Sequence, residues 1–191
     1  SVGTAALSGF TITRGNASLN MSGGPVVNGN TIQRRLGGGI MLYSSSPTIN
    51  NCNITGNAAI LNGGGVYFAV ASSGMVFSNC TISNNLCQYG AGLYLTTITT
   101  GSTFSNCIIT DNTATIHGGG IYAVSAAVTL ANCIVSGNSA GSGAGIYVFT
   151  SSSSMALTNC LFSGNNATNQ GGGMWCSSSS PVITNCTFTG N

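Results

Sequence analysis

The sequence predicts an all-β solenoid, a parallel β-helix with three short strands in each rung and about seven rungs. Two observations predict this fold. A phrase that opens with Gly-x-Gly and closes with Asn-Cys and a further Asn occurs six times, at steps of 25 to 28 residues, and such a period is typical of solenoids. Within each copy, apolar and polar residues alternate over runs of three to six residues, which indicates strands rather than helices.

The chain is expected to form one domain, residues 1–191, in three parts. Residues 1–16 hold a partial first rung, in which Leu7–Asn16 aligns with Leu157–Asn165 and Phe10 takes the cysteine position. Residues 17–36 are an inserted loop, which either lies on the binding side of the solenoid or folds over the first rung. Residues 37–191 hold six regular rungs, which start at Gly37, Gly63, Gly90, Gly118, Gly143 and Gly171.

Four apolar columns define the three strands that we expect in a regular rung. Two columns belong to the strand after the glycines, one to the strand before Asn-Cys, and one to the strand after it. The first column is Ile40, Val66, Leu93, Ile121, Ile146 and Met174, and the last is Ile54, Ile82, Ile109, Val135, Phe162 and Phe188. Four or five residues, such as Leu86–Tyr89 or Asn166–Gln170, then connect to the next rung. At a strand spacing of about 4.8 Å, the stack is a rod on the order of 30 Å long.

The Gly-x-Gly sequences are expected at corners, where a positive φ or a close approach of two backbones favours glycine. The middle residue is Ala at Ala91 and Ala144, so this position is expected to need only a small residue.

Two polar columns and one cysteine column recur at the same period, and all three are interpreted as architectural. The first is Asn51, Asn79, Asn106, Asn132, Asn159 and Asn185, which we expect to form an inner ladder of stacked amides. Each of these residues precedes a cysteine, in the column Cys52, Cys80, Cys107, Cys133, Cys160 and Cys186. The second polar column closes each repeat, at Asn57, Asn85, Asn112, Asn138, Asn165 and Asn191.

The cysteines are interpreted as buried thiols that act as small apolar spacers. Disulfides between neighbouring rungs are conceivable because the Cα separation is permitted, but parallel side chains in register are poorly aimed for that bond. A metal site is not expected, since CxxC pairs are absent and His117 is the only histidine, which we interpret as structural or solvated.

An outward column of large side chains follows the first apolar column. It comprises Met41, Tyr67, Tyr94, Tyr122, Tyr147 and Trp175. The rings either stack on one another and stiffen the sheet, or form a contact face for sugar rings or a neighbouring protein, and the two interpretations are compatible.

Composition excludes several functions. The formally charged residues are Arg14, Arg34, Arg35 and Asp111, which are too few cations for nucleic-acid binding. No segment is apolar enough to insert into a membrane. Glycoside hydrolysis needs two carboxylates, and lyase chemistry with calcium needs an acidic cluster with a basic catalyst nearby. We therefore expect neither an enzyme nor a cofactor.

Asn-x-Ser/Thr sequons mark candidate glycosylation sites at Asn20, Asn53 and Asn166. The sequons at Asn79 and Asn185 fall in the expected inner ladder and are expected to be inaccessible.

The phrases GFTITRGN, GGGIMLYSSSPTINNCNITGN and GGGMWCSSSSPVITNCTFTGN resemble secreted right-handed parallel β-helix proteins of the pectin-lyase-like class. They are especially similar to bacterial surface repeats of the polymorphic outer-membrane protein type. The resemblance covers nearly the whole chain except residues 17–36. It implies a single-stranded, right-handed β-helix and an exported location, extracellular or on the cell surface. It does not imply an activity, because the class contains lyases, hydrolases, adhesins and structural rods.

The first functional hypothesis is a non-enzymatic extracellular structural rod. The last rung is a regular repeat with no polar cap and the first rung lacks its opening strand, so we expect copies to stack head to tail into a filament, or the rungs to belong to a longer surface array. The alternative is an adhesin or carbohydrate-binding module that uses the aromatic column and the 17–36 loop. Ice binding is a minor option, because Thr11 and Thr13 fit a Thr-x-Thr array but Ile108 and Ile134 interrupt it.

Overall fold

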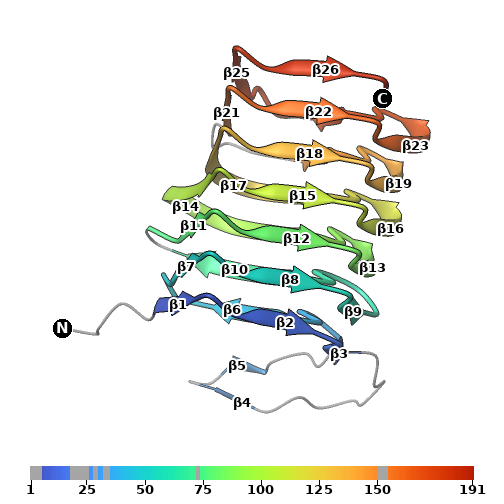
Figure 1. Cartoon of the computed structure of the whole chain (residues 1–191). Helices are drawn as coiled ribbons and strands as arrows, with labels where there is room; N and C mark the ends of the chain where they lie inside the picture. The colour runs from blue at the N-terminus through green and yellow to red at the C-terminus, as the bar shows by residue number, and fades with distance from the viewer. Residues whose placement is uncertain (1–5, 18–25, 28–29, 32–34, 72–73, 150–154) are drawn as a thin grey trace.

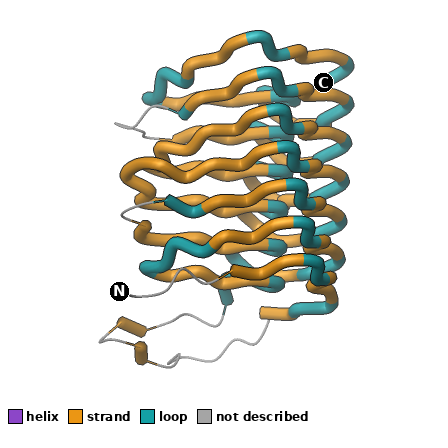
Figure 2. The backbone as a smooth tube through the Cα atoms, turned by 60° about the vertical axis from the view of Figure 1, so that its left-hand side comes forward, coloured by secondary structure: helices purple, strands orange, loops and turns teal. Residues whose placement is uncertain are grey.

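The chain winds into a stack of parallel turns that pass through three sheets, as Figures 1 and 2 show. The computed structural model describes residues 6–17, 26–27, 30–31, 35–71, 74–149 and 155–191. Within these residues there is no helix, and hence none long and apolar enough to cross a membrane. The predicted fold class, a parallel β-solenoid with three sheets, is confirmed.

Sheet A has eleven strands and forms two faces of each turn. Its strands are β1 (Ala6–Ser8), β6 (Ile40–Tyr43), β7 (Thr48–Asn50), β10 (Val66–Ala71), β11 (Val76–Ser78), β14 (Leu93–Ser105), β17 (Ile121–Ala131), β20 (Ile146–Phe149), β21 (Ala156–Thr158), β24 (Met174–Ser177) and β25 (Val182–Thr184). The strand predicted after the glycines and the strand predicted before Asn-Cys therefore share one sheet. In β14 and β17 they are even continuous.

Sheet B has seven strands in register, and sheet C has six. Sheet B contains β2 (Thr11–Thr13), β8 (Asn53–Thr55), β12 (Thr81–Ser83), β15 (Ile108–Thr110), β18 (Ile134–Ser136), β22 (Leu161–Ser163) and β26 (Thr187–Thr189). Sheet C contains β3 (Asn16–Ala17), β9 (Ala58–Ala59), β13 (Leu86–Tyr89), β16 (Thr113–His117), β19 (Ser139–Ser142) and β23 (Asn166–Gln170).

Sheet C corrects the sequence interpretation, because it is built from the segments predicted as connections. Its backbone groups pair from turn to turn, as when Leu86 N donates to Asn57 O at 2.9 Å. Its strands have few residues and several contain a register shift, so the alternation that marks a strand is short and interrupted.

The number of complete rungs is smaller than predicted. In the described part of the chain, five turns have both faces of sheet A together with a strand in sheet B and a strand in sheet C, namely those that begin at β6, β10, β14, β17 and β20. The turn β1–β3 is partial, as expected, and the turn β24–β26 has no strand in sheet C. Register between β2 and β8 pairs Thr11 with Asn53, so Phe10 does take the cysteine position.

Most of the expected insertion, residues 17–36, lies outside the described residues, and so does Arg34. Ala17 belongs to β3. The described remainder includes an antiparallel pair, β4 (Val26–Val27) and β5 (Asn30–Thr31), which is drawn beside the first turn in Figure 1.

Apolar side chains from sheets A and B fill the interior, and the cysteine column lies among them. The predicted burial is confirmed for Cys52, Cys80, Cys107, Cys133 and Cys160, while Cys186 is partly exposed. All eight cysteines are free thiols. Sheet C instead packs on the Gly-x-Gly corners through small side chains, namely Ala59, Cys87, Ala91, Ala114, Ala140 and Ala144.

Glycine is required at these corners for two different reasons. Gly118 has a φ of 66°, a backbone conformation that is strained for residues with a side chain. A Cβ on Gly92 would lie 2.5 Å from the carbonyl oxygen of Gly120 in the next turn, so the backbones approach too closely for any side chain. Both predicted roles are present.

The two asparagine columns are placed opposite to the expectation. Asn51, Asn79, Asn106, Asn132, Asn159 and Asn185 are exposed at the corner between sheets A and B, with φ between 51° and 53°. A left-handed residue that precedes an inward cysteine directs its own side chain outward. The prediction that this column is an inaccessible inner ladder is therefore wrong. Two amide hydrogen bonds along it, Asn106 Nδ2 to Asn79 Oδ1 and Asn159 Nδ2 to Asn132 Oδ1, are both 3.3 Å long and lie at the surface.

The inner amide ladder is the column that closes each repeat. Asn57, Asn85, Asn112, Asn138 and Asn165 are at most 1 % exposed. The side-chain oxygen of Asn57 accepts from Gly15 N at 2.9 Å. From Asn85 on, each side-chain oxygen accepts from the backbone N and the Nδ2 of the asparagine one turn earlier, as Asn138 does from Asn112 at 3.0 Å in both bonds. Each Nδ2 also donates to an apolar residue's carbonyl, as Asn112 does to Ile82 at 3.0 Å. These buried polar groups are therefore satisfied.

Candidate functional site: an aromatic face on sheet A

The aromatic column forms a continuous stack on the outer side of sheet A. Strand register places Tyr67, Tyr94, Tyr122, Tyr147 and Trp175 directly above one another. Successive ring centroids are 5.3, 5.2, 4.9 and 4.4 Å apart, with interplanar angles of 10° to 16°. The expected self-stacking is present, and we call this column the aromatic ladder.

A second column runs beside the ladder at the last residues before each Gly-x-Gly corner. Register aligns Asn62, Tyr89, His117, Ser142 and Gln170. Tyr89 meets Tyr122 edge to face at 5.7 Å, and Gln170 Oε1 accepts a 2.8 Å hydrogen bond from Trp175 Nε1. This side column has no common residue type, so no periodic pattern in the sequence predicts it.

His117 belongs to the same face. Its ring stacks on Tyr147 at 4.4 Å, so Tyr147 is only 7 % exposed although its column points outward. Burial lowers the pKa of His117, and its Nδ1 is buried without a hydrogen-bond partner. The structural interpretation of this histidine fits these contacts better than the solvated one.

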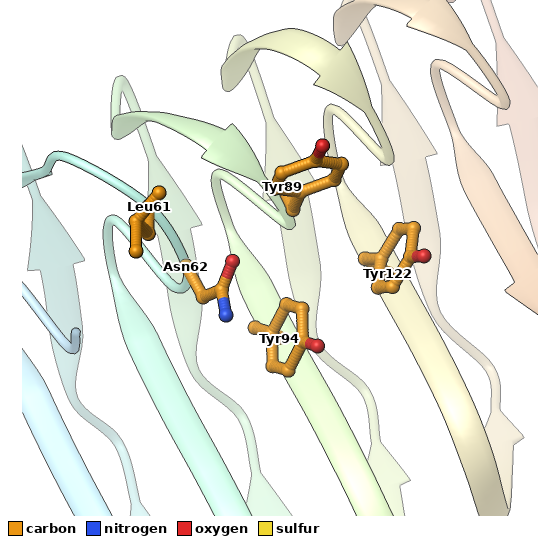
Figure 3. Close-up of a pocket in the computed structure, with 5 residues that line it drawn as sticks. All are labelled: Leu61, Asn62, Tyr89, Tyr94 and Tyr122. Atoms are coloured by element: carbon orange, nitrogen blue, oxygen red, sulfur yellow. The ribbon is translucent and has the colours of Figure 1, made fainter. Parts of the chain in front are cut away.

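A hollow of about 360 Å³ opens where the two columns diverge. It is lined by Leu61, Asn62, Tyr89, Tyr94 and Tyr122, which Figure 3 shows at the ends of the turns that begin at β6 and β10 and on β14 and β17. The hollow exists because the side column changes from the small Asn62 to the large Tyr89. Tyr89 leans over the next turn toward Tyr122 and leaves the space beside Tyr94 open.

The hollow is uncharged at neutral pH. Burial, together with repulsion from the neighbouring Tyr147 and Tyr89, raises the pKa of Tyr122 to about 12. Burial likewise raises the pKa of Tyr94 above its usual range. Their hydroxyls therefore stay protonated and can donate hydrogen bonds. Asn62 adds an amide, so the lining combines ring surface with neutral donors and acceptors.

The predicted glycosylation residues are not part of this face. Asn53 in β8 and Asn166 in β23 are exposed on sheets B and C, and Asn20 lies outside the described residues. Among the described residues, no group of three or more His, Cys, Asp or Glu side chains could hold a metal ion.

The fold, the sequence repeat and the stacked ladders together define this protein as a parallel β-solenoid. The family model described as "Right handed beta helix region" matches residues 2–97 and 62–191, so the chain belongs to this family. Searches among curated proteins and among solved structures found no match.

Proposed function

We propose that this protein is a non-enzymatic extracellular rod whose aromatic face binds neutral glycans. The observation that carries the proposal is the hollow beside Tyr94, with three tyrosines and an asparagine in an uncharged lining. Small-ligand sites combine apolar and aromatic walls with a few fixed polar groups, and this lining does so.

The stack limits how a glycan can bind. Within the aromatic ladder, neighbours cover the ring faces of Tyr94 and Tyr122, so these rings offer edges and hydroxyls to a ligand. Tyr89 stands outside the stack, tilted by 66° to Tyr122. We therefore assign Tyr89 the main ring contact with a sugar and the ladder the role of a rigid wall. A preformed wall reduces the entropy lost on binding.

A glycan array probed with the wild-type protein and two single variants tests this function. Tyr89→Ser removes the tilted ring, and Tyr43→Ser removes an exposed tyrosine of β6 outside the ladder. We expect retention of uncharged glycans by the wild type and by the Tyr43 variant, with at least a tenfold loss for the Tyr89 variant. Equal retention by both variants, or no retention by a folded wild type, would contradict the proposal.

End-to-end assembly of the rod is a second candidate. In the last described turn, Ile183 and Phe188 are 46 % and 42 % exposed, whereas their register partners Leu157 and Phe162 are fully buried. A further turn would cover them, whether it came from the same polypeptide or from another copy. Electron microscopy of native material distinguishes filaments from separate short rods. Short rods that stay separate at high concentration would contradict assembly.

A further inference from the structure

Two sequons lie at the exposed corner between sheets A and B, although the sequence analysis predicted that both are inaccessible. Asn79 begins Asn79-Cys80-Thr81 and Asn185 begins Asn185-Cys186-Thr187. Both asparagines are exposed, with φ of 52° and 51°. We infer that Asn79 and Asn185 carry N-linked glycans, an inference that rests on the exported location proposed above.

The hydrogen bond that Asn79 makes along the corner column uses its amide oxygen and not the nitrogen that a glycan modifies. Asn79 uses its Oδ1 to accept a 3.3 Å hydrogen bond from Asn106 Nδ2. An N-glycan is attached through Nδ2 and keeps the amide oxygen, so this contact survives modification. In the transfer, Nδ2 loses a proton and bonds to the sugar C1 of a polyprenyl-pyrophosphate-linked oligosaccharide. The C1–O bond to the pyrophosphate breaks, and the lipid pyrophosphate leaves.

The two sequons bracket a strip of apolar side chains on sheet B. Between Thr81 and Thr187, the same outward column contains Ile108, Ile134 and Leu161. Ile108 and Ile134 are 40 % and 38 % exposed. Asn79 and Asn185 lie four turns apart, roughly 19 Å at the strand spacing of about 4.8 Å, so glycans at the two ends can cover the strip between them.

Because the chain has few charged residues, glycans at this corner would help to keep its surface hydrated. The full sequence has three cationic and one anionic side chain among 191 residues, so charge does little to keep the surface soluble. Sugar hydroxyls supply the hydration that charged groups supply elsewhere. The remaining four members of the corner column have the same left-handed turn but no hydroxyl two residues later, at Asn51, Asn106, Asn132 and Asn159.

The test is mass spectrometry of the protein from its native cells, fractionated into intracellular and extracellular material. Treatment with a peptide amidase that converts a glycosylated asparagine to aspartate marks each modified site. We expect the mark at Asn79 and Asn185 in extracellular protein and none at Asn106, which is the internal control. Unmodified Asn79 and Asn185 in extracellular protein would overturn this inference and leave export intact. Recovery only from inside the cells would overturn the exported location as well.

Two variants expressed in the same cells test the role of the hydroxyl. Thr81→Val keeps the side-chain shape and is expected to abolish the mark at Asn79 alone. Ile108→Thr completes a sequon at Asn106 and is expected to add a mark there, because the exposed left-handed corner is repeated and a modified Nδ2 keeps one N–H for its bond to Asn79. Persistence of the Asn79 mark in the first variant would show another chemistry and overturn the inference.

Discussion

Asn112 Oδ1 accepts two hydrogen bonds from Asn85, from its backbone N at 3.0 Å and from its Nδ2 at 2.9 Å. Both residues are at most 1 % exposed. The same two bonds recur from turn to turn along sheets B and C, so each turn satisfies the polar groups of its neighbour. The repeated asparagine is therefore the element that fixes the corner.

Asn112→Ala should destabilise the protein strongly. It removes the acceptor of the backbone N–H and of one amide N–H of Asn85, at about 1–3 kcal/mol each, while the other amide N–H keeps its bond to Ile54 O. We therefore expect the free energy of unfolding to fall by about 3 kcal/mol or more. Asn106→Ala, at the exposed corner, should cost about 1 kcal/mol, chiefly for the left-handed backbone. Urea unfolding measures both. Equal costs would show that the buried ladder is not the stabilising one.

The middle position of Gly-x-Gly provides a second stability test. A Cβ on Gly119 would lie 2.5 Å from Ser139 O and 2.7 Å from Ala144 O, so Gly119→Ala should cost about 1–3 kcal/mol. Ala91→Gly, at the equivalent site two corners away from Ala144, should cost about 0.5–1 kcal/mol through backbone entropy. Thermal unfolding compares the two variants. An unchanged unfolding temperature for Gly119→Ala would mean that the position needs only a small residue, as the sequence analysis predicts.

Thiol accessibility should follow depth in the stack. Cys176 is exposed and Cys186 partly so, whereas the other six cysteines are buried. Burial also raises the pKa of Cys87 to about 12, which keeps it a poorly reactive thiol. In native protein, a maleimide should modify Cys176 first, Cys186 more slowly, and the rest only in denaturant. Peptide mapping identifies the sites, and rapid native modification of Cys107 would contradict the packing.

The aromatic ladder should make the free energy of unfolding decrease as the pH rises through the alkaline range. The folded pKa of Tyr122 is about 12, above the ordinary value of 10.0. Below pH 10 the hydroxyl is neutral in both states, and its contribution to stability is complete. As pH rises from 10 to 12, the unfolded chain ionises first, so that contribution is lost. Urea midpoints across this range should fall less for Tyr122→Phe than for the wild type. An identical fall would exclude Tyr122 as a source.

The sequence predicts the repeat, the register and the interior well, because each apolar column recurs once per turn. Ile82, Ile109 and Val135 align in register as their spacing indicates. Periodicity alone could not decide which asparagine column points inward, since both have the same period. Asn106 precedes the buried Cys107, so alternation along the chain directs Asn106 outward. A corner between Ile109 and Asn112 interrupts this alternation and directs Asn112 inward, and only the backbone conformation shows where that corner lies.

The candidate site was predicted in part. The column from Tyr67 to Trp175 follows directly from the repeat, and its stacking follows from the strand spacing. Tyr89, His117 and the hollow could not be found in this way, because their column changes residue type at every turn and lies at register shifts in sheet C. The candidate site thus lies where the repeat departs from regularity.

NMR chemical-shift mapping tests the proposed function most directly, with labelled protein titrated with the neutral oligosaccharides that the array retains. We predict that saturable shifts concentrate on Leu61, Asn62, Tyr89 and Tyr94, which line the hollow. Shifts confined to sheet B around Thr81 and Ile108, or no shifts at saturating sugar, would contradict the account.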